Sequence, residues 1–221
     1  MANLYIIPSG FFSYNLLLEF FFAVITLVVS LYAFRIYKLS EQKQSKFFAV
    51  SFLFFSVHYF IQSFLNFAIK SELGKNICIA MKIQGVNILN LYGVYSYLLF
   101  FMLGLVTLTY MALKIKSARV YILLVVISVL SIFLSQNKIY MYYFTSSILL
   151  IFICEHYLRN YLKNRQVKTL LVMTAFMFLL FSNIHFIFAV NHSAYFIVGR
   201  FLELGAYLLI LLNLFIVLKD G

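Results

Sequence analysis

The chain has 221 residues, of which 65% are hydrophobic, 20% aromatic and only 10% charged, and its mean hydropathy is +1.01. About a quarter of the residues in a soluble domain are charged, so this composition excludes a water-soluble protein and favours one that lies in a lipid bilayer. The net charge of +11 would favour nucleic acid in a soluble chain; here we assign it to loops beside membrane spans and expect no nucleic-acid partner.

Seven apolar stretches approach the length of about 20 residues that a helix needs to cross a bilayer. They cover residues 14–36, 46–68, 86–112, 118–135, 139–160, 167–190 and 194–218, and the fourth is the shortest. No basic segment precedes the first, so we expect it to remain as a helix rather than act as a signal peptide. The sequence therefore predicts an all-α, multi-pass seven-transmembrane helix bundle in the cell membrane. We expect residues 1–221 to form one domain without a separate soluble module.

The basic residues predict the orientation, because Lys and Arg gather on the cytoplasmic side of membrane spans. Twelve lie in alternate breaks and at the C-terminus: Arg35, Lys38, Lys43, Lys46, Lys114, Lys116, Arg119, Arg159, Lys163, Arg165, Lys168 and Lys219. Four lie on the other side: Lys70, Lys75, Lys82 and Lys138. We therefore expect the N-terminus outside and the C-terminus in the cytoplasm.

The first three and the last three spans share several features. The first and the fifth span end in an Arg-x-Tyr triplet, a histidine lies in the second and the sixth, and two glycines lie in the third and the seventh: Arg35, Arg159, His58, His185, Gly93, Gly104, Gly199 and Gly205. This pattern is compatible with a 3+1+3 parallel repeat of the kind found in some transporters, including the SWEET family. Chance similarity among spans rich in Phe, Ile and Leu is the alternative.

Polar side chains inside the spans are the best candidates for function, because burying them in lipid is costly. Several share a helix face through i, i+3 or i, i+4 spacing, and most lie in the outer half of the predicted bundle, whereas the inner halves are strongly apolar. The sequence thus predicts an outward-facing polar pocket. Its candidate ligand-binding residues are Glu19, His58, Gln62, Asn66, Asn87, Asn90, His185, Arg200 and Glu203.

The sharpest group is Arg200 with Glu203 and Glu19, which we expect at similar depth. Arg200 would suit a carboxylate or phosphate on a ligand, and either glutamate would take up a proton. The structural alternative is an i, i+3 ion pair between Arg200 and Glu203, with Glu19 tethering the first helix to the last. Both interpretations predict damage on mutation.

We expect no cofactor, no metal site and no catalytic residues. His58 and His185 as axial haem ligands are disfavoured by their unequal depth. Lys219 lies at the terminus, so the last span has no mid-membrane lysine for a retinal Schiff base. Cys78 and Cys154 make no metal-binding spacing, and we treat both as structural. An enzyme is the third-ranked function, because no nucleophile-base pair is visible.

Two segments, Arg35-Ile-Tyr-Lys-Leu-Ser40 and Gly199-Arg-Phe-Leu-Glu-Leu-Gly205, carry a resemblance over the whole chain. The chain resembles small, uncharacterised seven-span membrane proteins of archaea and, more distantly, the seven-helix membrane sensor domains of histidine kinases. The resemblance implies a sensor that passes its state to a separate partner, and neither segment is a catalytic motif.

The leading hypothesis is a receptor-like or sensor-like module that binds a small ligand, anionic or amphipathic, in the outward pocket. Ligand binding would favour one packing of the helices over another and alter the basic cytoplasmic loops, which would signal to a cytoplasmic or membrane partner. The alternative is a small-solute transporter or ion channel built from parallel three-helix repeats. The only proline is Pro8, so the proline-kinked helices of SWEET-like carriers are lacking.

Overall fold

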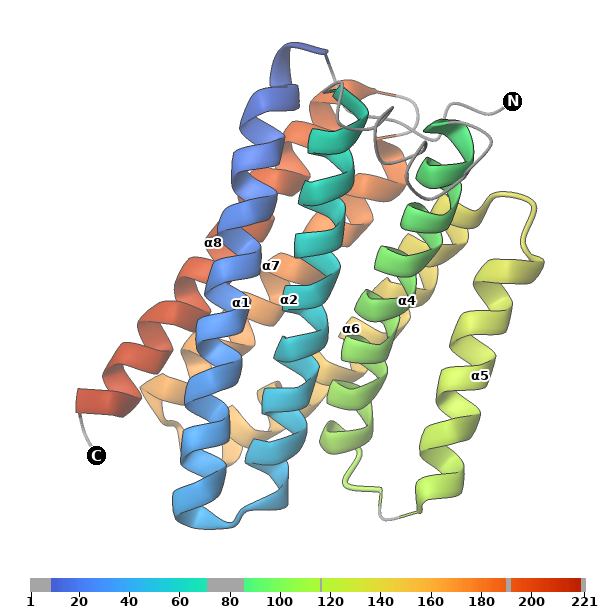
Figure 1. Cartoon of the computed structure of the whole chain (residues 1–221). Helices are drawn as coiled ribbons and strands as arrows, with labels where there is room; N and C mark the ends of the chain where they lie inside the picture. The colour runs from blue at the N-terminus through green and yellow to red at the C-terminus, as the bar shows by residue number, and fades with distance from the viewer. Residues whose placement is uncertain (1–8, 71–85, 116, 190–191, 220–221) are drawn as a thin grey trace.

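The computed structural model describes residues 9–70, 86–115, 117–189 and 192–219, which form seven α-helices, one short 3-10 turn and no strand (Figure 1). The turn Ser9–Phe11 leads into α1 (Phe12–Ser40), followed by α2 (Lys43–Lys70), α4 (Val86–Ala112), α5 (Ala118–Leu134), α6 (Lys138–Asn164), α7 (Val167–Phe188) and α8 (Ser193–Lys219).

All seven predicted spans are confirmed as helices, and most boundaries agree within a few residues. Within the described ranges, six helices are long and apolar enough to cross a membrane. The exception is α5, whose 17 residues extend about 25 Å, somewhat less than the hydrocarbon core of a bilayer. Many large apolar side chains are exposed on the outer surface, among them Leu17, Phe64, Ile122 and Phe215, as expected where lipid replaces water.

Six of the helices form a closed ring. Each packs against its neighbours in the order α1, α2, α4, α6, α7 and α8, and α8 returns to α1. The remaining helix, α5, packs against α4 and α6 and stands at the edge of the bundle (Figure 1). The ring has two halves, α1–α2–α4 and α6–α7–α8. The halves meet along two seams, which we name the α1/α8 seam and the α4/α6 seam.

The connections α1–α2, α4–α5 and α6–α7 lie at the same end of the ring (Figure 1). We name it the basic end, after the basic residues that it carries: Arg35, Lys38, Lys43, Lys46, Lys114, Arg119, Arg159, Lys163, Arg165 and Lys168. Helices α1, α4 and α6 each end there near a residue in the left-handed backbone region: Glu41, Lys114 and Arg165, with φ of 54°, 53° and 49°. None of the three is the glycine that usually occupies such a position.

Glycines allow close helix packing in both halves, which matters in lipid because helix association depends on packing and on polar contacts. A Cβ on Gly104 of α4 would lie 2.5 Å from the Phe55 ring of α2. A Cβ on Gly199 of α8 would lie 2.7 Å from the Phe186 ring of α7. In each half, therefore, an aromatic side chain of the second helix occupies the space that a glycine leaves on the third.

Candidate functional site

Arg200 of α8 is buried between two carboxylates, nearer the end of the ring that is opposite the basic end. Its Nη2 lies 3.0 Å from Oε1 of Glu19 on α1, and its Nη1 lies 2.8 Å from Oε2 of Glu203, one turn further along α8. The residues are 4%, 0% and 5% exposed, respectively. The contacts that the sequence predicts among these three residues are therefore present.

Glu19 accepts two further hydrogen bonds. The side-chain nitrogen of Asn15, one turn earlier on α1, donates to Oε1 over 2.6 Å, and that of Asn66 on α2 donates to Oε2 over 2.7 Å. Both asparagines are buried. With Arg200, three donors from three helices surround one carboxylate, an arrangement that lets a charged group remain buried.

Glu203 connects this group to two tyrosines. Its Oε1 accepts a hydrogen bond from the hydroxyl of Tyr59 on α2, and the Tyr59 hydroxyl lies 2.9 Å from that of Tyr207 on α8. The Arg200 guanidinium also lies 5.4 Å from the ring centre of Phe186. We name Asn15, Glu19, Tyr59, Asn66, Arg200, Glu203 and Tyr207 the polar cluster.

The polar cluster joins α1, α2 and α8 through hydrogen bonds that need close alignment. Removing one partner of a buried ion pair costs about 3–5 kcal/mol, because the other charge is left uncompensated. Two buried atoms of the cluster have no hydrogen-bond partner, Oδ1 of Asn15 and Nε of Arg200.

The two tyrosines of the cluster pack with Phe22 of α1 into a layer of three aromatic side chains, all fully buried. Their ring centres are 5.1 to 5.6 Å apart. These rings form the edge of the polar cluster that is nearer the basic end.

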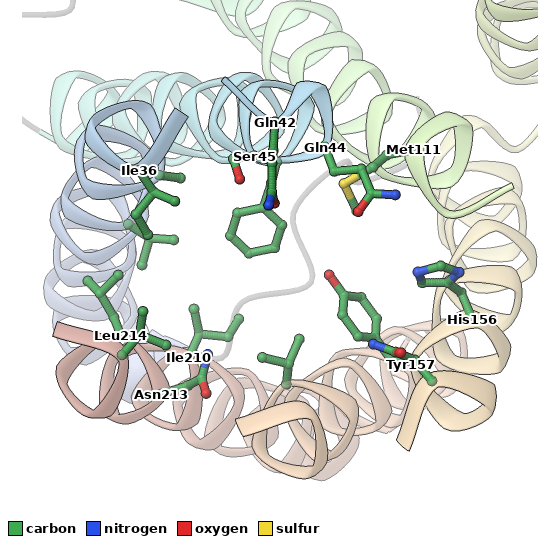
Figure 2. A pocket seen from close by; sticks show the side chains of 16 residues that line it. Ile36, Gln42, Gln44, Ser45, Met111, His156, Tyr157, Ile210, Asn213 and Leu214 are labelled. Atoms are coloured by element: carbon green, nitrogen blue, oxygen red, sulfur yellow. The ribbon is translucent and has the colours of Figure 1, made fainter. Parts of the chain in front are cut away.

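A pocket of about 250 Å³ lies beyond this layer, inside the ring at the basic end (Figure 2). All six ring helices and the α1–α2 connection contribute to its lining. Figure 2 shows side chains converging from helices on all sides, with the Tyr157 hydroxyl turned into the space. Gln42 and Gln44 line it and are exposed, so the pocket reaches the surface at this end.

The lining combines apolar walls with uncharged polar groups. The polar members are Gln42, Gln44, Ser45, His156, Tyr157, Asn160 and Asn213, and the apolar ones are Val29, Ala33, Ile36, Phe48, Met111, Val172, Ile210, Leu214 and Val217. No Asp, Glu, Lys or Arg is among these lining residues. Oδ1 of Asn213 is buried and has no hydrogen-bond partner.

Four of the nine predicted ligand-binding residues meet in the polar cluster: Glu19, Asn66, Arg200 and Glu203. These four side chains are joined by hydrogen bonds. The sequence predicts instead that they line an outward-facing polar pocket. The pocket lies nearer the basic end, where the sequence predicts strongly apolar parts of the spans.

The remaining predicted residues lie elsewhere. His58 is buried on α2, with Nδ1 2.7 Å from the Tyr97 carbonyl oxygen of α4, and His185 bonds over 2.8 Å to the Phe181 carbonyl of its own helix. Gln62 is half-buried and makes none of the hydrogen bonds of the cluster. The side chains of Asn87 and Asn90 lie outside the described residues, although both positions belong to α4.

Sequence reasoning did not select Tyr59 or the pocket. Tyr59 reads as one more aromatic residue of an aromatic-rich span, and Gln42, Gln44 and His156 read as solvated helix ends. Asn213 did carry a signal, since it is an isolated amide within the apolar run 208–217. A lone amide in such a run needs a hydrogen-bond partner or a cavity.

The fold and composition define a multi-pass helical membrane protein. Comparison with known protein families, curated proteins and solved structures finds no match to this chain. Among the described residues, no group of three or more His, Cys, Asp or Glu side chains is placed to hold a metal ion. The polar cluster and the pocket are therefore the features of this chain that bear on its function.

Proposed function

We propose that the protein is a sensor, in which a small molecule bound between the two halves of the ring changes how the halves pack. A ligand shifts a conformational equilibrium only by binding one arrangement better than the other. Its site must therefore contact both parts that move.

The proposal rests on the hydrogen bonds of the polar cluster that cross the α1/α8 seam. Three of its hydrogen bonds cross between the halves: Arg200 to Glu19, Tyr59 to Glu203, and Tyr59 with Tyr207. The other three remain within one half and would move with it. Three such bonds are together worth a few kcal/mol, a range in which two packings can both be populated.

The pocket contacts the same two halves. Val29, Phe48 and Met111 line it from the first half, and Tyr157 and Asn213 line it from the second. A bound molecule would thus change the relative free energies of two packings without touching the polar cluster. The positive-inside rule assigns the basic end to the cytoplasm, where the basic loops would meet a separate signalling partner.

The proposal can be tested by measuring distances between spin labels across the two halves. In a chain with Cys78 and Cys154 replaced by serine, labelled cysteines at Lys38 of α1 and Lys163 of α6 report on separate halves, and both positions are exposed. Labels at Lys38 and Lys46 are the matched control, because both lie in the first half.

Glu19→Gln weakens the ion pair across the seam, so we expect the distance distribution between positions 38 and 163 to gain a second component. The distribution between positions 38 and 46 should stay single. If neither Glu19→Gln nor Tyr59→Phe changes the distances between positions 38 and 163, the polar cluster does not control the packing of the halves, and the sensor proposal fails.

A small-solute carrier is the second candidate, favoured by one observation: the pocket reaches the surface at the basic end, whereas the polar cluster nearer the other end is buried. The corresponding glycine contacts of α4 with α2 and α8 with α7 support a parallel repeat. A cysteine at Ala33 in the pocket separates the candidates. A carrier exposes it in turn to both faces of the membrane, so a membrane-impermeant maleimide labels it from either side; a sensor allows labelling from the basic end alone.

A further inference from the structure

We infer that the pocket at the basic end binds an uncharged amphipathic molecule of about ten non-hydrogen atoms with one hydrogen-bonding polar group. The inference deepens the proposed sensor function and rests on it for the consequence of binding. The binding itself follows from the size, charge and hydrogen-bonding capacity of the lining residues.

The volume limits the size of the ligand. A protein cavity of about 150 Å³ accommodates benzene, which has six non-hydrogen atoms. In proportion, the 250 Å³ of this pocket suits about ten. Most drug-sized ligands need larger pockets, so they would not fit inside the ring without a change in helix packing.

The lining disfavours a charged ligand. A charge that enters the pocket loses hydration and meets no Asp, Glu, Lys or Arg side chain among the residues that line it. The basic residues named for this end lie outside the lining, most of them exposed to solvent. They would attract an anion to the entrance but would not contact it inside the pocket.

Two polar side chains indicate an uncharged polar group on the ligand. Asn213 contributes a side-chain amide to the wall, between the apolar lining residues Ile210 and Leu214 of α8. An amide donates hydrogen bonds through its nitrogen and accepts them through its oxygen. The Tyr157 hydroxyl, turned into the same space, can donate to or accept from the same group.

Apolar side chains form the rest of the wall and would contact a short hydrocarbon body. A molecule with many hydroxyl groups would leave several of them unpaired against these walls, which is costly. A primary amide or an alcohol on a short alkyl chain satisfies all three constraints. Octanamide and octanoate each have about ten non-hydrogen atoms and the same shape, and octylammonium is about one atom smaller, so these three probes share an alkyl chain and carry a neutral, a negative and a positive head group.

The experiment uses the full chain in lipid nanodiscs with a photoreactive diazirine derivative of octanamide. We expect saturable labelling of peptides from α6 and α8 that line the pocket. Octanamide should compete at least about tenfold better than octanoate or octylammonium, because a charge finds no partner there. Equal competition by octanoate would overturn the inferred ligand class.

Variants separate binding in the pocket from partition into lipid. Ile210→Trp fills the pocket and should abolish the saturable labelling, whereas Leu212→Trp, at an exposed position two residues further on, should not. Asn213→Leu should weaken octanamide binding about tenfold. Asn213→Asp should shift the preference from octanamide to octylammonium. Labelling that survives Ile210→Trp would refute a site inside the ring.

The spin-label distances distinguish failure of this inference from failure of the sensor proposal. Saturable octanamide binding that leaves the distances between positions 38 and 163 unchanged would retain the ligand class and refute the switch. Distances that respond to Glu19→Gln, without specific octanamide binding, would retain the switch and refute the ligand class.

Discussion

Replacing the charges of the polar cluster singly and together measures what holds α1 and α8 at their seam. Arg200 faces two carboxylates, so Glu19→Gln or Glu203→Gln alone leaves the guanidinium with one partner. The double variant leaves it buried with none. The single losses should thus be small and the double loss larger than their sum, because only the double variant leaves an uncompensated charge.

The magnitudes follow from the contacts. Each single variant replaces a charged acceptor with an amide that can still accept a hydrogen bond, so we expect a loss of about 1–2 kcal/mol. The double variant should lose a further 3–5 kcal/mol or so. At about 2–4 °C per kcal/mol for a chain of this size, the total loss of about 5–9 kcal/mol should lower its thermal midpoint by roughly 10–35 °C.

The assay is the fraction of protein that still elutes as a monodisperse peak from size-exclusion chromatography after heating. Adding Arg200→Met to the double variant removes the unpaired charge and should restore much of the midpoint, because buried ion groups can be replaced by apolar ones. Glu155→Gln is the control, since Glu155 pairs with Arg159 on the exposed face of α6 and should change little. A double variant that loses only the sum of the single losses would refute the charge-pairing argument.

Three further predictions concern packing, turns and orientation. Gly104→Ala places a Cβ 2.5 Å from the Phe55 ring and should cost about 1–3 kcal/mol, measured as a lower thermal midpoint, whereas Gly205→Ala, whose nearest contact is 3.1 Å, should cost less. Arg165→Gly removes the strain of a side chain at φ 49° and should raise the midpoint by an amount corresponding to about 1 kcal/mol; a lower midpoint would contradict this. A cysteine at Lys163 should react with an impermeant maleimide only from the cytoplasmic side of the membrane, and labelling from outside would reverse the predicted orientation.

The seven helices could be predicted because a bilayer imposes a length on apolar segments that remains visible in the sequence. The contacts of Arg200 with Glu203 and Glu19 could also be predicted, since a charge buried in a membrane protein needs a partner and this chain offers few. The first prediction depends on the length and hydropathy of single segments. The second depends on charged residues, which are rare inside the spans.

The ring order and the pocket could not be predicted in this way. The role of Tyr59 depends on which helix faces α2 across the ring, and nothing in its own span sets it apart from the other aromatic residues. The polar lining comes from helix ends and a connection, where Gln42, Gln44 and His156 are compatible with simple solvation. We expected an outward-facing polar pocket near Arg200 on the assumption that the polar faces of different helices turn toward a ligand. The described side chains of the cluster instead turn toward one another.

Because α5 is short, the apolar surface of the bundle spans less of the bilayer on that side. Where an apolar helix is shorter than the hydrocarbon core, the bilayer must thin or flanking residues must extend toward its surface. This adjustment costs free energy, and the cost depends on membrane thickness. Because α5 packs on α4 and α6, a mismatch there exerts its force beside the α4/α6 seam, on the opposite side of the ring from the polar cluster. Membrane thickness would thus act as a second input on the packing of the two halves, independent of any molecule in the pocket.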